Sequence, residues 1–122
     1  FFKTNGGRLD TGFAVYSMGN FISNQRWRYS DAGVVLKIII KKNLINGTIS
    51  ISKVTILPTW VFKGKIKNKN IFEILPAADT LNNVFVHEMS DEDKQKMLQS
   101  FFDTKNILTL LTHCISVENI YP

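Results

Sequence analysis

A short polar segment, residues 24–29, gathers side chains that are able to bind an anion. It reads Asn24-Gln25-Arg26-Trp27-Arg28-Tyr29 and lies between two apolar stretches. Arginine suits a planar, bidentate contact with phosphate or carboxylate, so Arg26 and Arg28 are candidate ligands of an anionic partner. The same side chains would also serve to pin a loop onto a sheet through internal hydrogen bonds. Both interpretations stay open at the level of sequence.

Lysines alternate along a second segment, residues 63–69, which Phe62 and Phe72 flank. Basic residues beside aromatic ones are typical of nucleic-acid-binding surfaces, but they also mark an exposed hairpin tip whose charge prevents edge pairing. Only the lysine run favours nucleic acid, so we expect no nucleic-acid partner. The net charge of +5 is compatible with an anionic polymer, such as polyglutamate or a phosphate-bearing glycan. The candidate contacts for such a polymer are Arg8, Arg26, Arg28, Lys63, Lys65, Lys67 and Lys69.

Known catalytic and metal-binding motifs do not occur in the sequence. His87-Glu88 begins like the zinc-protease pattern HExxH, but residue 91 is aspartate. His113 lies beside Cys114, the single cysteine, and this pair has too few partners for a zinc site and no partner for a disulfide. There is no phosphate-binding glycine loop and no nucleophile elbow around Ser17. We therefore expect no catalytic residue, no metal ligand and no cofactor in this chain.

The first part of the chain is predicted to form strands. With 44% hydrophobic residues and 20% charged residues the chain has the composition of one folded domain, and no apolar run is long enough to span a membrane. Residues 12–18 are apolar almost throughout, which indicates a strand buried on both faces and ending at Gly19-Asn20. Residues 33–41 alternate, and Asn46-Gly47 predicts a hairpin turn. In the returning strand from Thr48, the apolar phase slips at Ser52-Lys53, which predicts a β-bulge.

The later elements follow from turn residues and helix signals. We expect Pro58 to end the returning strand because it has no N–H to donate. Residues 60–62 and 71–75 then form a second hairpin with a basic tip. After Pro76 we expect short helices at 77–81 and 106–116, and between them a helix capped by Ser90 that reaches Phe102. The predicted class is α+β, with an antiparallel-rich sheet over about residues 12–76 and a helical tail over residues 77–122.

Several segments resemble one protein family. Val15-Tyr16-Ser17-Met18-Gly19-Asn20-Phe21-Ile22 resembles the Tyr-Ser-Leu-Gly-Asn-Phe element of the CapA-type capsule synthesis proteins, the poly-γ-glutamate capsule biosynthesis family. The similarity continues through Ser23–Arg26, Asp31–Gly33, Leu57–Val61 and Ile74–Pro76. It covers about residues 12 to 76, and no motif of the helical tail takes part in it.

The resemblance implies a calcineurin-like metallophosphatase fold, of which this chain would form the second half of the β-sandwich. It implies that the intact protein resembles a metal-dependent phosphoesterase with a pair of divalent metals, acting in capsule or envelope polymer synthesis or export. The family's metal ligands, including a His-Pro-His just before the Tyr-Ser-Leu-Gly-Asn-Phe element, have no counterpart in this sequence. Asn20 and Arg26 would then lie at the rim of a substrate or phosphate site. The family places the protein at the bacterial cell envelope or outside the cell.

The expected partners follow from the same reasoning. The sequence opens at Phe1 without signal-peptide features, and we expect a piece of a longer protein. Its first partner would be the amino-terminal half of its own domain. Without that half, a strand that is apolar on both faces favours a homo-oligomer. The alternative function is a non-catalytic scaffold or anionic-polymer-binding module that uses Arg28, Lys63, Lys65 and Lys67.

Overall fold

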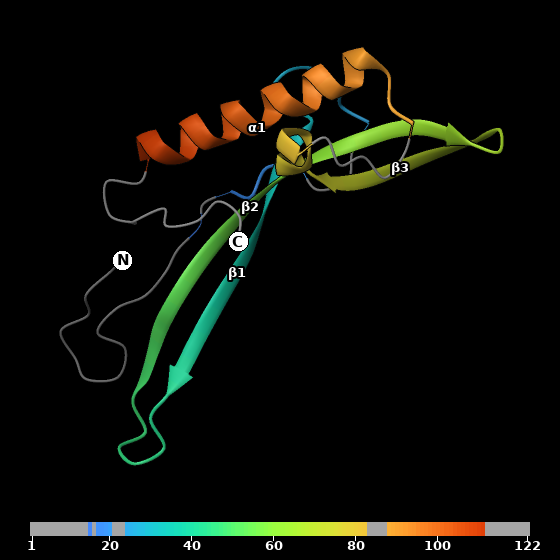
Figure 1. Ribbon diagram of the computed structural model, residues 1–122. Coiled ribbons are helices and arrows are strands. Elements are labelled where there is room, and N and C mark those ends of the chain that lie inside the picture. The colour runs from blue at the N-terminus through green and yellow to red at the C-terminus, as the bar shows by residue number, and fades with distance from the viewer. Residues whose placement is uncertain (1–14, 16, 21–23, 83–87, 112–122) are drawn as a thin grey trace.

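A three-stranded antiparallel sheet, with strand order β1-β2-β3, is followed by a 3-10 helix, η1, and one α-helix, α1 (Figure 1). The computed structural model describes residues 15, 17–20, 24–82 and 88–111. The elements are β1 (Ala32–Lys42), β2 (Ile49–Ile66), β3 (Lys69–Pro76), η1 (Ala77–Asn82) and α1 (Asp91–Leu111). The α+β class and the antiparallel sheet are therefore confirmed.

Strands β1 and β2 form a long hairpin, here called the arm, that extends away from the helix (Figure 1). Ile39 lies opposite Lys53, whereas Ile40 lies opposite Ile51, so Ser52 is one extra residue in β2. This confirms the predicted bulge. Since one extra residue inverts the pleat, the bulge keeps the apolar residues of β2 on one face on both sides of it.

The prediction that Pro58 ends its strand is wrong, because β2 runs without a break for 18 residues. Pro58 lies opposite Val34, and the N–H of Val34 donates away from β2, to the carbonyl of Met18 at 2.9 Å. This pair is therefore a non-hydrogen-bonded one, in which the N atoms of both residues point away from the partner strand. Pro58 loses no bond to β1, and β3 pairs with β2 only from Thr59 onward.

The second hairpin, β2–β3, turns over two residues. Ile66 lies opposite Lys69, and the turn residues Lys67 and Asn68 have φ values of 48° and 63°. Two successive residues with positive φ form the turn type that matches the twist of a hairpin. The expected basic hairpin is present with its tip exposed, but its strands are longer than predicted. Most of residues 63–70, expected to form the tip, belong to β2 and β3.

The helical part departs from the prediction in one respect. The short helix at 77–81 is present as η1, but the two later helices are a single helix, α1, through Asp91–Leu111. Between Phe102 and Ile107 there is no glycine or proline to interrupt it. Ser90 is the N-cap, since its Oγ accepts the N–H of Asp93 at 3.1 Å. Residues 112–116 of the expected last helix lie outside the described residues.

The core lies where α1 and η1 cover β2 and β3. Its residues are Trp60, Phe62, Leu75, Ala77, Ala78, Met89, Met97 and Phe101. The distal half of the arm takes no part in it. In the described part of the chain, neither α1 nor η1 has the length and hydrophobicity that a membrane-spanning helix requires.

The expected strand at residues 12–18 falls largely outside the described part of the chain. Val15 and Met18, which are described, are exposed and belong to no strand, so the burial expected on both faces is absent at these two positions. Among the described residues that follow, Gly19 forms an isolated bridge with Gly33 of β1. The N–H of Asn20 donates to the carbonyl of Ala32 at 2.9 Å beside this bridge.

Candidate functional site

The arginine-containing segment, residues 24–31, lies along the edge of β2 where β1 has not yet begun. Among the described residues, no strand pairs with this edge of β2 beyond Trp60, the partner of Ala32. The N–H of Val61 donates to the carbonyl of Asp31 at 3.2 Å, and the guanidinium of Arg26 donates to the carbonyl of Val61 at 2.7 Å. The segment therefore satisfies backbone groups that an open edge would leave to solvent.

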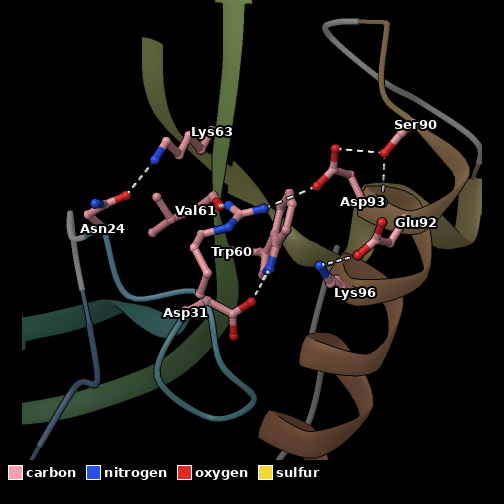
Figure 2. Close-up of polar contacts among 10 residues, drawn as sticks. Asn24, Asp31, Trp60, Val61, Lys63, Ser90, Glu92, Asp93 and Lys96 are labelled. Carbon is pink, nitrogen blue, oxygen red and sulfur yellow. Dashed lines mark hydrogen bonds and ion pairs between the residues drawn. The ribbon is translucent and has the colours of Figure 1, made fainter. Parts of the chain in front are cut away.

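Arg26 connects the sheet to the start of α1. Its second guanidinium nitrogen lies 3.1 Å from Oδ1 of Asp93, and its guanidinium carbon lies 4.9 Å from the ring centre of Trp60. Figure 2 shows Asp93, Trp60 and Val61 converging at this point, with Ser90 hydrogen-bonded to Asp93. The guanidinium lies over the Trp60 ring and donates two hydrogen bonds at the same time. Arginine is suited to this geometry and lysine is not.

Arg28 makes a bidentate ion pair with Asp103 in the middle of α1. Both nitrogen–oxygen distances, from Nε to Oδ2 and from a terminal nitrogen to Oδ1, are 2.7 Å. Asp103 is buried, with 9% of its surface exposed. The hydrogen bonds from Arg28 lower the pKa of Asp103, because they favour its charged form more than burial disfavours it. The same pair raises the pKa of Arg28.

Three further hydrogen bonds hold the segment in place. Asp31 is buried and accepts the indole N–H of Trp60 at 2.7 Å. The side-chain amide of Asn20 donates to the carbonyl of Ser30 at 2.6 Å and to Oε1 of Gln25 at 3.4 Å. Asn20 therefore connects the two ends of the segment, at Gln25 and Ser30.

We call the four charged residues Arg26, Arg28, Asp93 and Asp103 the arginine clasp. The clasp joins the segment, the sheet and α1, because each guanidinium bridges from the segment to a carboxylate of the helix. Of the two sequence interpretations, a loop pinned by arginine describes the observed contacts. Each guanidinium is already paired with an aspartate, which partly neutralises its charge before any anion approaches.

The aspartates of the clasp were not singled out from the sequence, and helical spacing gives no signal for them. At about 100° per residue, Asp103 lies about 200° around the helix from buried Phe101 and about 120° from buried Met97, so it is not on their apolar face. Asp103 is buried beside Arg28, a residue that lies far away in the sequence. No spacing in the sequence points to Asp93 or to the Trp60 indole.

The lysines of β2 and β3 have fewer partners. Lys63 donates to Oδ1 of Asn24 at 2.8 Å (Figure 2) and lies 5.4 Å from the ring centre of Phe72. In the described part of the chain, no ion pair or hydrogen bond holds the side chains of Lys65, Lys67 or Lys69. From Ala32 through Phe72 there is no aspartate or glutamate, while the stretch contains Lys37, Lys41, Lys42, Lys53, Lys63, Lys65, Lys67 and Lys69. The sheet therefore has a positive charge without acidic compensation from its own strands before Glu73.

Metal chemistry and known relatives give no further identification. Within the described residues, no group of three or more histidine, cysteine, aspartate or glutamate side chains could hold a metal ion. Arg8, His87, His113 and Cys114 lie outside that part of the chain. Comparisons with models of protein families, with curated proteins and with solved structures found no match.

Proposed function

We propose that this chain is the carboxy-terminal structural portion of a CapA-like capsule (poly-γ-glutamate) biosynthesis protein of the bacterial envelope. The intact protein would resemble a metal-dependent phosphoesterase acting in polymer synthesis or export. One observation carries the proposal. Four of the sequence segments that resemble this family, far apart along the chain, converge on one packing node.

The node is built from backbone-specific residues. Gly19 has a φ of 74° and pairs with Gly33 across the bridge. A Cβ on Gly19 would lie 2.7 Å from the carbonyl oxygen of Ala32, and one on Gly33 would lie 2.4 Å from that of Asn20. Both contacts are closer than a side chain tolerates, so glycine is required at both positions.

The other family-like segments join at the same place. Asp31 binds the indole of Trp60, and Thr59 lies opposite Pro76 in the β2–β3 ladder. These residues hold the segments together, and the contacts described for them are structural ones. This supports a structural role for the matched motifs, with catalysis left to other residues of a longer protein. The rim role of Asn20 and Arg26 stays a prediction.

The arm supplies a surface for the missing half of such a protein. One face of the arm, here called the apolar ladder, consists of Val34, Leu36, Ile38, Ile40, Ile49, Ile51, Val54, Ile56 and Pro58. Burial falls along it, from Ile56 and Pro58 near the helix to exposed Ile38, Ile40 and Ile49. Because a two-stranded hairpin is marginally stable in water, a second layer on this face would stabilise it. The proposed layer is the amino-terminal half of the domain.

The test compares this chain with the longer gene product that contains it. We expect the longer protein to hold about two divalent metal ions per molecule and to hydrolyse a phosphate ester, as two-metal sites do. We also expect slow amide hydrogen exchange at Val35 and Lys37, whose N–H groups point toward β2, in the longer protein and faster exchange in this chain alone. A longer protein with neither bound metal nor protected arm amides would contradict the proposal.

A second candidate function is supported by the charge distribution. The acid-free stretch with eight lysines, from Ala32 through Phe72, favours a non-catalytic module that binds an anionic polymer. We expect binding of poly-γ-glutamate to weaken as salt rises and to weaken in Lys65→Ser/Lys67→Ser. The control is Lys96→Ser, because Lys96 is already paired with Glu92 on α1. Affinity that is independent of salt would contradict this function.

A further inference from the structure

The arm ends in an exposed loop with aliphatic side chains, residues 43–48, which we call the tip. Its two apical side chains, Leu44 and Ile45, are 89% and 99% exposed. The tip is the end of the arm farthest from the helix and the core (Figure 1). Ile40 and Ile49, directly behind it, are also exposed. Adjacent exposed aliphatic side chains of this size mark an interaction surface.

The tip is ordered by its own hydrogen bonds. The backbone N–H groups of Ile45 and Asn46 donate to Oδ1 of Asn43, at 2.8 and 3.3 Å. Those of Gly47 and Thr48 donate to the carbonyl of Asn43 at 2.9 Å and to Oδ1 of Asn46 at 3.0 Å. An amide without a partner is costly in an apolar medium, so this network lowers the cost of moving the loop out of water.

Basic side chains lie directly behind the tip. Lys41 and Lys42 precede it on β1, opposite Ser50 and Ile49, and Lys53 follows it on β2. All three are exposed, and no acidic residue lies between Ala32 and Phe72. A lysine can bury its aliphatic stem in an apolar layer while its ammonium group stays at the polar surface.

We propose that the tip inserts into the surface of an anionic lipid bilayer. Leu44 and Ile45 enter the boundary between headgroups and acyl chains, and Lys41, Lys42 and Lys53 contact the negatively charged headgroups. This binding activity goes beyond the proposed function and does not depend on it.

Two other occupants fit the tip less well. Residues 32–57 contain no aromatic side chain, so the arm offers no platform on which nucleic-acid bases could stack. Pairing with the tip of a second copy would bring two sets of lysines together without intervening acids, and this repulsion disfavours it. An anionic lipid surface complements both the apolar apex and the charge behind it.

Vesicle binding by the full chain tests the proposal. We expect binding to vesicles of phosphatidylcholine with phosphatidylglycerol, weaker binding at high salt and little binding to phosphatidylcholine alone. Leu44→Ser/Ile45→Ser should lower the partition coefficient at least about tenfold, since it removes two buried aliphatic side chains. Lys41→Gln/Lys42→Gln should lower it by about fivefold per lysine at low salt. The matched control is Ile107→Ser/Leu110→Ser, two exposed aliphatic residues of α1, which should bind as the unmodified chain does.

Depth of insertion gives a second readout. When anionic vesicles are added, the emission of an Ile45→Trp variant should shift to the blue and be quenched by brominated acyl chains. Both effects should be larger than in the unmodified chain. Unchanged binding of the tip variant, equal loss in the α1 control or no quenching of the new tryptophan would overturn the proposal. So would absence of binding to anionic vesicles, or a tip variant that only dissociates a dimer. Circular dichroism should show that the variants fold, because the replaced side chains are solvent-exposed.

Discussion

Asp31 and Trp60 form the most buried polar contact among the residues described. Trp60 is fully buried, and its indole N–H donates to a carboxylate that is itself shielded from water. A hydrogen bond to a charged acceptor contributes more than a neutral one, and removing one partner leaves the other unsatisfied. The contact connects the residue before β1 to the core, so the role of Asp31 is structural.

Asp31→Ala is therefore expected to lower the free energy of unfolding by about 2 kcal/mol, because the buried indole N–H loses its acceptor. Asp31→Asn keeps an acceptor oxygen and should cost less. Urea unfolding of the three proteins measures both effects. If the alanine and asparagine variants were as stable as the unmodified chain, the contact would contribute nothing.

The Arg28–Asp103 pair makes stability depend on pH. The pKa of Asp103 is lowered in the folded state, below the value of about 3.9 for an unfolded aspartate. The stabilisation is thus fully present above about pH 4 and is lost as the pH falls through the lowered pKa. Asp103→Asn should be less stable than the unmodified chain at pH 6, and the difference should shrink below pH 4.

Thermal unfolding from pH 6 to pH 2 measures this difference. Glu92→Gln is the control, because Lys96 also lowers the pKa of Glu92 but the pair lies on the surface, where it contributes little. A difference between Asp103→Asn and the unmodified chain that stayed constant down to pH 2 would argue against the assignment.

At the scale of elements, two local devices shape the fold. Ser90 begins α1 by accepting the N–H of Asp93, and it also donates to Oδ2 of Asp93 at 2.8 Å. Ser52 bulges from β2 and so lets two stretches of opposite apolar phase share one face. Each device sits at the point where a regular pattern starts or changes.

Ser90→Ala should destabilise the chain by about 1 kcal/mol, since the first turn of α1 loses its cap. Ser90→Asp should retain most of that stability because its carboxylate can accept the same N–H. Equal melting temperatures for the alanine variant and the unmodified chain would show that the cap is dispensable.

Deleting Ser52 should be tolerated, because Lys53 would remain opposite Ile39 and Ile51 opposite Ile40. Deleting Thr55 is the matched control and should be harmful. It moves Val54 off the apolar ladder and puts Lys53 onto it, at a cost of about 1 kcal/mol or more. Amide hydrogen exchange in β1 reports both outcomes, and equal protection in the two deletions would contradict the bulge argument.

At the scale of the whole molecule, packing and exposure are unevenly divided. The helix, η1 and β3 pack around one end of β2, whereas no other described element packs on the far end of the arm. Burial of the apolar ladder by a second surface would be favourable. The lysines on the same strands repel a second positively charged surface. Self-association is therefore a balance of these two effects.

We expect the isolated chain to form dimers more strongly at high salt, because screening weakens the repulsion between lysines while apolar attraction persists. Ile38→Thr, in the middle of the ladder, should weaken the dimer, and Leu44→Ser/Ile45→Ser at the tip should not. Sedimentation velocity at several concentrations and salt levels measures this. A strict monomer under all conditions would refute the prediction.

Local sequence signals were enough to predict β1, the turn at Asn46-Gly47, the bulge in β2, the Ser90 cap of α1 and the presence of a basic hairpin. These depend on neighbours in the chain: residue alternation, turn preferences and capping. Local signals misjudged two features. Strand β2 continues through Pro58 because of how Pro58 pairs with Val34 on β1. The two expected helices form one helix, α1, because no glycine or proline separates them. The clasp was decided only in three dimensions, because its bonds join residues more than sixty positions apart. Burial and charge pairing at such separations are properties of the folded chain, and no spacing in the sequence encodes which aspartate an arginine will meet.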